Sequence, residues 1–178
     1  MYYAAVVCPQ EINSRIENFK NYMHERYGCT HALKSPAHIT LIPPFYFDSN
    51  DELKLKEKLR EVNKTLKPFE ITLSGFGCFN QRVIYVDVME NASLNALYDA
   101  MTGFFADILT NTRHRENRNF HPHITIATRD IPPADFGKAY EYFTALGFAA
   151  RFRTTQISLL KLIQGKWEVV YPLVETGT

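Results

Sequence analysis

The sequence has few cysteines and no cysteine pair. Cys8, Cys29 and Cys78 are odd in number and far apart, and no two of them have the Cys-x-x-Cys spacing. A disulfide framework needs an even set of cysteines, and a zinc ribbon needs close pairs of thiolates. The cysteines therefore predict neither a disulfide-stapled scaffold nor a structural zinc site.

The chain also lacks an excess of charge of one sign and a long apolar run. Its formal net charge of +1 argues against a protein that coats a long stretch of nucleic-acid backbone. A small phosphorylated ligand, or only the end of an RNA, fits this balance better. No apolar segment approaches the roughly 18 residues that span a bilayer, and no basic leader precedes Pro9. We therefore expect a cytoplasmic protein without a membrane partner.

No linker or low-complexity segment divides the chain. With 46% apolar residues, 178 residues can bury a full core, so we expect one domain over residues 1–178, and a monomer. Apolar spacing predicts helices after Pro9, after the cap residues 48–51, after Asn91 and after the proline pair 132–133. Runs of β-branched and aromatic residues predict strands over 2–7, 69–79, 82–89, 151–162 and 167–173.

One tetrapeptide pattern, His-x-Thr-apolar, occurs twice. The first copy is His38-Ile39-Thr40-Leu41, and the second, about 85 residues later, is His123-Ile124-Thr125-Ile126. Because a strand alternates its faces, each His and its Thr point the same way while the apolar residues turn into a core. Each copy thus offers one imidazole beside one hydroxyl.

Two such tetrads facing one another provide metal-free acid–base chemistry around an anion. One neutral imidazole can take a proton from an attacking water or hydroxyl, and the other, protonated, can donate one to the leaving oxygen. The hydroxyls of Thr40 and Thr125 can bind non-bridging phosphate oxygens. The pattern predicts His38 and His123 as catalytic residues in a site without cofactor or metal, and leaves open which one is the acid.

The order of elements around the tetrads repeats as well. In each half a helix precedes the tetrad strand, and a proline pair, a helix and two strands follow it; Pro43–Pro44 is expected to close the first tetrad strand. This order predicts a pseudo-duplication with two α/β lobes, each of which contributes one tetrad strand.

The segment His121-Pro122-His123 allows other interpretations. It is similar to the motif of histidine-triad nucleotide hydrolases, but Thr125 stands where a third histidine is needed. A metal pair is a further alternative, with Asp130 as the nearest hard ligand, although the spacing of a recognised metal site is missing. We expect His121 to be a loop or strand-entry residue that supports substrate binding.

Several further residues are candidates for substrate contacts. Arg129 follows the second tetrad and is the best single candidate for a phosphate-facing cation. Tyr46 follows the first tetrad and could stack on a base, although core packing is the usual role of such an aromatic residue. The basic stretch Arg113-His114-Arg115, with Arg118, is either a solvated loop or a guide for an RNA end, and Trp167 is expected to pack.

The two tetrads with their flanks, Ala37–Phe45 and Pro122–Ala127, resemble the motifs of the two-histidine (2H) phosphoesterase superfamily, and in particular its bacterial 2′-5′ RNA ligase-like branch. The resemblance implies a bilobal, pseudo-symmetric α+β fold in which two antiparallel sheets line a central groove with helices outside. By matching positions it also implies His38 and His123 as acid and base and Thr40 and Thr125 as phosphate binders.

The resemblance implies metal-independent processing of phosphodiesters in RNA or nucleotides. Our leading hypothesis is a phosphodiesterase that opens the 2′,3′-cyclic phosphate of a nucleotide or an RNA end and gives the 2′-phosphate. The alternative within the same chemistry is a 2′-5′ RNA ligase or 2′-5′ phosphodiesterase. The alternative of another class is a module that binds an RNA end or a nucleotide without turnover.

Overall fold

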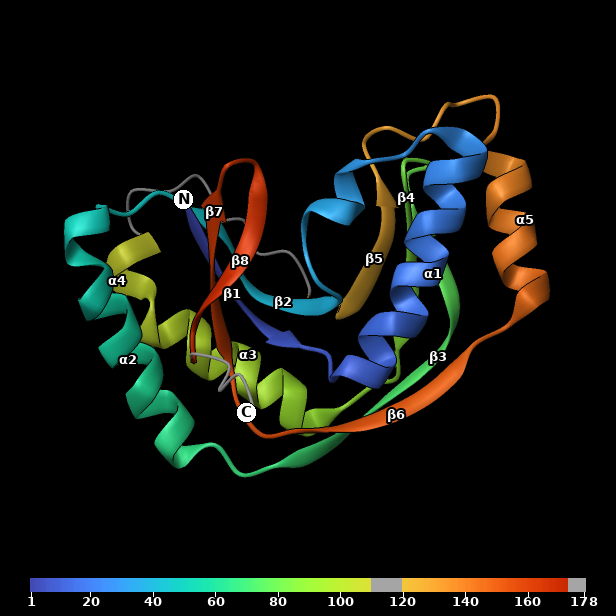
Figure 1. The fold of residues 1–178 in the computed structure, drawn as a ribbon. Coiled ribbons are helices and arrows are strands. Elements are labelled where there is room, and N and C mark those ends of the chain that lie inside the picture. The colour runs from blue at the N-terminus through green and yellow to red at the C-terminus, as the bar shows by residue number, and fades with distance from the viewer. Residues whose placement is uncertain (110–119, 173–178) are drawn as a thin grey trace, which may run out of the picture.

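A computed structural model describes residues 1–109 and 120–172 of the protein (Figure 1). The element order is β1 (Tyr2–Val7), α1 (Gln10–Tyr27), the 3-10 helix η1 (His31–Lys34), β2 (His38–Phe45), the 3-10 helix η2 (Ser49–Asp51), α2 (Glu52–Thr65), β3 (Phe69–Phe79), β4 (Val83–Val88), α3 (Ala92–Phe104), α4 (Ala106–Leu109), β5 (His123–Thr128), α5 (Phe136–Leu146), β6 (Ala149–Thr154), β7 (Ser158–Ile163) and β8 (Lys166–Tyr171). The basic stretch from Arg113 to Arg118 lies outside the described residues.

The strands form two antiparallel sheets, as predicted for this α+β fold. Sheet A has the strand order β2-β1-β7-β8, and sheet B has the order β5-β4-β3-β6. Each tetrad strand, β2 or β5, is therefore an edge strand of its sheet. These two edge strands contact one another, so the two sheets meet at the strands that carry the tetrads.

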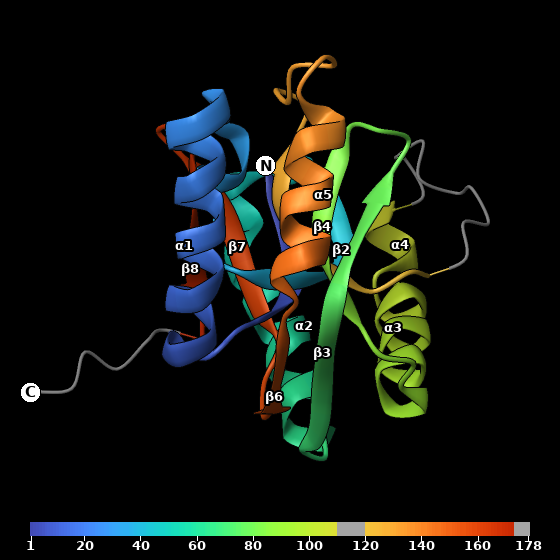
Figure 2. The same ribbon diagram turned by 90° about the vertical axis from the view of Figure 1, so that its right-hand side faces the viewer.

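Helices cover one face of each sheet. On sheet A, α2 packs on β7 and α3 packs on β2; on sheet B, α5 packs on β3 and α1 packs on β5 (Figure 1). In the turned view of Figure 2, α1 and α5 stand side by side, and the rings of Tyr22 and Tyr142 stack between them at 4.0 Å. The helix that leads into β2 thus packs on β5, while the helix that precedes β5 in the chain packs on β2.

The repeat is real in element order, but the lobes are not contiguous halves of the chain. The units β1-α1-β2-α2 and β4-α3-β5-α5 correspond, and in each the tetrad strand pairs with the strand that begins the unit. Sheet A, however, is completed by the C-terminal strands β7 and β8, and β3 from the first half lies in sheet B. Each sheet therefore combines segments from both halves.

Three expected boundaries were wrong. β2 runs through Pro43 and Pro44 to Phe45, because an edge strand tolerates residues that donate no ladder hydrogen bond. The expected strand over 151–162 is two strands, β6 and β7, since the chain crosses from sheet B to sheet A between them. The helix after Asn91 is interrupted at Phe105, and α4 follows.

The main core fills the space between the sheets and their helices. The apolar tetrad residues Ile39, Leu41, Ile124 and Ile126 all lie in it with at most 1% of their surface exposed. A second, small cluster lies on the opposite face of sheet A, where the buried residues Tyr3, Ala5 and Leu160 pack with Val7, Trp167 and Val169. That opposite face carries the site described below.

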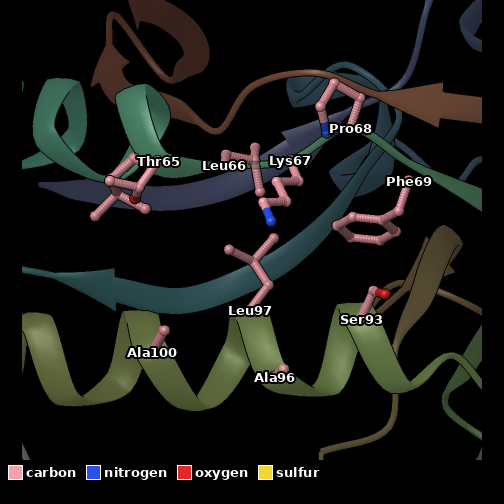
Figure 3. A pocket seen from close by; sticks show the side chains of 10 residues that line it. Thr65, Leu66, Lys67, Pro68, Phe69, Ser93, Ala96, Leu97 and Ala100 are labelled. Atoms are coloured by element: carbon pink, nitrogen blue, oxygen red, sulfur yellow. The ribbon is translucent and has the colours of Figure 1, made fainter.

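A cavity of about 440 Å³ opens between the end of α2, the start of β3 and α3 (Figure 3). Its lining is mostly apolar, and the residues are Val62, Thr65, Leu66, Lys67, Pro68, Phe69, Ser93, Ala96, Leu97 and Ala100. None of them belongs to a tetrad. Among the described helices, none combines the length and the apolar character that crossing a membrane requires.

Glu52, at the start of α2, ties this helix to sheet A. Its Oε2 accepts hydrogen bonds from the Tyr2 hydroxyl at 2.9 Å and from the Lys161 ammonium at 2.6 Å, and its Oε1 lies 2.7 Å from the Lys56 ammonium. Burial alone raises the pKa of Glu52, but the hydrogen bonds from Lys161, Lys56 and Tyr2 outweigh it and hold that pKa at about 2.

We predict that Glu52→Gln lowers the free energy of unfolding at pH 7 by about 1–3 kcal/mol, because charge-assisted hydrogen bonds are lost. The folded-state pKa is depressed, so the stabilisation is full above the unfolded value of about 4.3 and is lost as the pH falls toward 2. Denaturant unfolding should show the difference from wild type shrinking over that range. Glu57→Gln, an exposed change on the same helix, is the control; an equal loss there would contradict the prediction.

Candidate functional site

The first tetrad has the alternation that its sequence predicts. His38 and Thr40 are half-buried on one face of β2, while Ile39 and Leu41 are buried on the other. Opposite them on β1 lie Val7 and Ala5, which belong to the small cluster on the face of sheet A opposite the main core.

The second tetrad repeats this arrangement in sheet B. His123 and Thr125 are half-buried on one face of β5, while Ile124 and Ile126 are buried in the core. Their partners on β4 are polar or aromatic: Asp87 lies opposite His123, and Tyr85 lies opposite Thr125. The two imidazoles thus have equivalent backbone positions but different neighbours.

Both imidazoles are oriented by the same hydrogen bond. Nδ1 of His38 lies 2.8 Å from the carbonyl oxygen of Pro36, and Nδ1 of His123 lies 2.7 Å from that of His121, two residues upstream in each case. Because a carbonyl oxygen only accepts, each Nδ1 must carry the hydrogen. In the neutral imidazole Nε2 then has the free lone pair, so each histidine can accept a proton there and, once charged, donate it.

A β-bulge follows each Thr. The pairing shifts by one residue at Leu41 in β2 and at Ile126 in β5, so the fourth tetrad residue is the extra one in both strands. Each bulge lets two successive apolar residues turn inward, Leu41 with Ile42 and Ile126 with Ala127. This explains why the fourth residue of each tetrad is apolar, because its buried side chain holds the bend of the strand directly after the Thr.

The environment of His38 favours the neutral imidazole. Burial lowers the pKa of His38 to about 4; the Pro36 carbonyl opposes this shift, while the positive charges of Lys20 and His123 reinforce it. The Tyr3 ring lies against the imidazole with a centroid distance of 4.9 Å, and it also contacts Trp167 at 4.6 Å. An apolar, aromatic surface therefore flanks the first imidazole.

The environment of His123 is more polar. Burial lowers its pKa and the His121 carbonyl raises it; the charge of His121 then lowers it, and the Asp87 carboxylate raises it. The rings of Phe79 and Tyr85 both lie 5.0 Å from the imidazole. A Cβ at Gly77 would come within 2.5 Å of the Tyr85 ring, so this glycine makes room for Tyr85 beside the site.

His121 joins the second tetrad through its side chain as well as its carbonyl. Its Nε2 lies 3.2 Å from the Tyr85 hydroxyl and 3.4 Å from Oδ1 of Asp87. Asp130 is directed elsewhere, because its Oδ2 accepts hydrogen bonds from the backbone N–H groups of Thr30 and His31 and lies 2.8 Å from Nδ1 of His31. Within residues 1–109 and 120–172, no three His, Cys, Asp or Glu side chains gather as metal ligands.

Two substrate-side candidates, Tyr46 and Arg129, lie outside the tetrad strands. Tyr46 is 79% exposed and follows the far end of β2, about 25 Å along the strand from His38. Arg129 is exposed and lies just beyond β5, with a left-handed backbone (φ 69°) and its N–H directed to the Arg82 carbonyl. The structure thus places His38 and Thr40 on one edge strand and His123 and Thr125, with the adjacent His121, on the other, and these two strands contact one another. Tyr46 lies beyond the far end of β2 and is not brought to them.

Sequence reasoning missed the residues around the tetrads. Tyr85 and Asp87 stand two apart in a predicted strand, so their shared face was readable, but its pairing with β5 was not. Lys20 left a clearer signal in the sequence, because it interrupts the apolar stripe of α1 formed by Ile12, Ile16 and Met23. In the structure its side chain is buried with that stripe, with only 2% of its surface exposed. A charge at such a position is a reason to look for a partner.

Known sequences similar to this chain were found by two comparisons, which agree with one another. The model of the 2′-5′ RNA ligase superfamily matches residues 8–166. A Geobacillus kaustophilus protein provisionally named a phosphoesterase is 30% identical over 99% of this chain and 98% of its own length. A second relative with the same kind of name, from Geobacillus sp. WCH70, is 29% identical over 88% of each chain.

Solved structures share the fold at low sequence identity. The Thermus thermophilus protein TT0787 superposes with a TM-score of 0.68 at 18% identity, covering 95% of this chain and 94% of that one. Escherichia coli LigT in complex with 3′-AMP gives a TM-score of 0.62 at 21% identity, covering 94% and 92%. With the family model matching most of its length, the chain belongs to the 2′-5′ RNA ligase superfamily of 2H phosphoesterases.

Proposed function

We propose that this protein is a metal-independent phosphodiesterase that opens the 2′,3′-cyclic phosphate of a nucleotide or an RNA end and gives the 2′-phosphate. The observation that carries the proposal is the matched pair of Nδ1–carbonyl hydrogen bonds, which leaves both Nε2 atoms free for proton transfer. A module that only binds a phosphate would need a cation more than two such imidazoles.

In the proposed reaction water attacks phosphorus and the bond to the 3′ oxygen breaks. One imidazole takes a proton from the water at Nε2, and the other donates its Nε2 proton to the leaving 3′ oxygen. Attack and departure on opposite sides of phosphorus need two separate proton carriers, and β2 and β5 are separate edge strands in contact that supply one each.

Thr40 and Thr125 are proposed to bind the non-bridging phosphate oxygens. Each shares a strand face with its histidine, so both hydroxyls and both imidazoles can address one phosphate. Charge grows on these oxygens in the transition state, and a hydrogen bond there favours the transition state over the bound substrate.

Cleavage or ligation of 2′-5′ junctions in RNA is the second candidate, since the family model that matches the chain is that of the 2′-5′ RNA ligase superfamily. It uses the same proton transfers with a ribose hydroxyl in place of water. Arg129, exposed beyond the second tetrad, is the side chain that we propose for contacts with such a longer substrate.

We predict turnover of 2′,3′-cyclic nucleotides or of RNA with a cyclic phosphate end in the presence of excess chelator, with a 2′-phosphate product. His38→Ala and His123→Ala should each lower kcat/KM by about 100-fold or more, because each removes one proton carrier. Product analysis by chromatography with 2′- and 3′-phosphate standards measures both points.

His24→Ala is the matched control, because His24 is exposed on α1 and its imidazole has no described partner. Full activity in either tetrad variant would sink the paired acid–base assignment, and abolition by chelator would refute the metal-free mechanism. Turnover of a 2′-5′-linked dinucleotide but of no cyclic phosphate would favour the second candidate. Nucleotide binding without any product would favour the binding module.

Thr40→Val and Thr125→Val should lower kcat by roughly 10- to 100-fold with a smaller change in KM, since the lost hydrogen bonds are strongest in the transition state. Steady-state kinetics at the pH optimum checks this. Thr72→Val, an exposed change on β3, should leave kcat unaltered. A rise in KM alone would show that the hydroxyls bind ground-state substrate only.

A further inference from the structure

Lys20 is a buried ammonium on α1. It lies on the core side of α1 with 2% of its surface exposed, and its Nζ donates a 2.8 Å hydrogen bond to the carbonyl oxygen of Ser35. Among the described residues, no carboxylate forms an ion pair with it. An unpaired buried charge is costly to the fold, so its position calls for a functional explanation.

Lys20 is hydrogen-bonded to the segment that leads to His38. The Ser35 carbonyl that it holds is adjacent to Pro36, whose own carbonyl fixes Nδ1 of His38. Asn13, from the same helix face, accepts the Ala37 N–H at 2.6 Å. The segment leading to His38 is therefore held by two buried polar side chains of α1, and the ammonium is too buried to reach a substrate.

The surroundings of His123 contain a carboxylate beside the positive charge of His121. Asp87 lies directly across the ladder from His123, at the position where Val7 lies across from His38. The charge of a buried cation thus acts on one imidazole, and a carboxylate lies across the ladder from the other. The backbone repeat is symmetric, but the charges around it are not.

We propose that Lys20 is a positioning residue that keeps His38 neutral, so that His38 is the general base and His123 is the general acid. This assignment rests on the proposed phosphodiesterase function. The reverse assignment would need a charged imidazole beside Lys20 and a neutral one beside Asp87, which is the less favourable arrangement of both pairs.

Several other titratable groups lie near Lys20 and the two catalytic histidines. Burial lowers the pKa of Lys20 to about 8, while Glu17 and Cys8 raise it, so the ammonium keeps its charge below about pH 8. Besides Lys20, the groups that face His38 are Tyr3 on β1 and His123 on β5. Those that face His123 are Asp87 and Tyr85 on β4, and His121.

The test is a pH titration of the imidazole Cε1–H signals by NMR in wild type, Lys20→Met and Lys20→Gln. The glutamine can still donate to Ser35 but carries no charge, so it separates the charge from the hydrogen bond. We expect the pKa of His38 to rise by about one unit in both variants, the size of one charge–charge interaction in a protein. Lys34→Met, which removes an exposed charge next to Ser35, should leave it unchanged.

The same variants should alter the pH dependence of kcat/KM on a 2′,3′-cyclic nucleotide. A higher pKa of the base moves the acid limb of the profile to higher pH by a similar amount, because the base must be neutral to accept a proton. Asp87→Asn should instead lower the pKa of His123 and move the basic limb to lower pH. The two limbs thus report on the two histidines separately.

An unchanged His38 titration in both Lys20 variants would overturn the proposal. The proposal would also be overturned if Asp87→Asn, and not the Lys20 variants, shifted the acid limb of the kcat/KM profile, because His123 would then be the base. Should neither Lys20 variant fold, wild type decides alone, since the proposal requires His38 to titrate below His123. Absence of any turnover by wild type would refute the proposed function, while the titration would still show whether Lys20 holds His38 neutral.

Discussion

The exchange of helices between the two sheets is the constraint on which the site depends. α1 leads into β2 but packs on β5, and α3 packs on β2 although the chain after it continues toward β5. Each tetrad strand is therefore covered by a helix of the other repeat unit. Because neither strand can shift without disturbing the other unit, the contact between β2 and β5 is fixed by the main core and not by the site residues themselves.

Backbone carbonyl groups orient both imidazoles of the site. The carbonyl groups of Pro36 and His121 hold the two rings, so the tautomer depends on strand geometry and not on a carboxylate relay. The side chains around each ring are then free to differ between the units. Val7 and Lys20 surround His38, and Asp87 and His121 surround His123, which allows two rings with one geometry to have different proton affinities.

Much of the site could be predicted because strand alternation is local. The faces of His38 and Thr40, and of His123 and Thr125, follow from a period of two, and their core partners follow with them. Sheet membership could not be predicted, since the separation of β6 from β7 and the pairing of β1 with β7 depend on contacts far apart in the chain. The bulges at Leu41 and Ile126 likewise appear only in the register. The proline pair predicted a strand end at Pro43, but β2 continues because it is an edge strand, and its edge position could not be read from the sequence.

The place of β1 in its sheet also bears on how the protein is made. β1 leaves the ribosome long before β7, yet it lies between β2 and β7, and it pairs with β7 from Tyr2 to Ala5. Until residues 158–163 have been synthesised, one side of β1 has unpaired backbone groups. While the residues between β1 and β7 are being synthesised, the nascent chain thus carries an open, apolar strand edge, and sheet A is completed only after β7 and β8 have emerged.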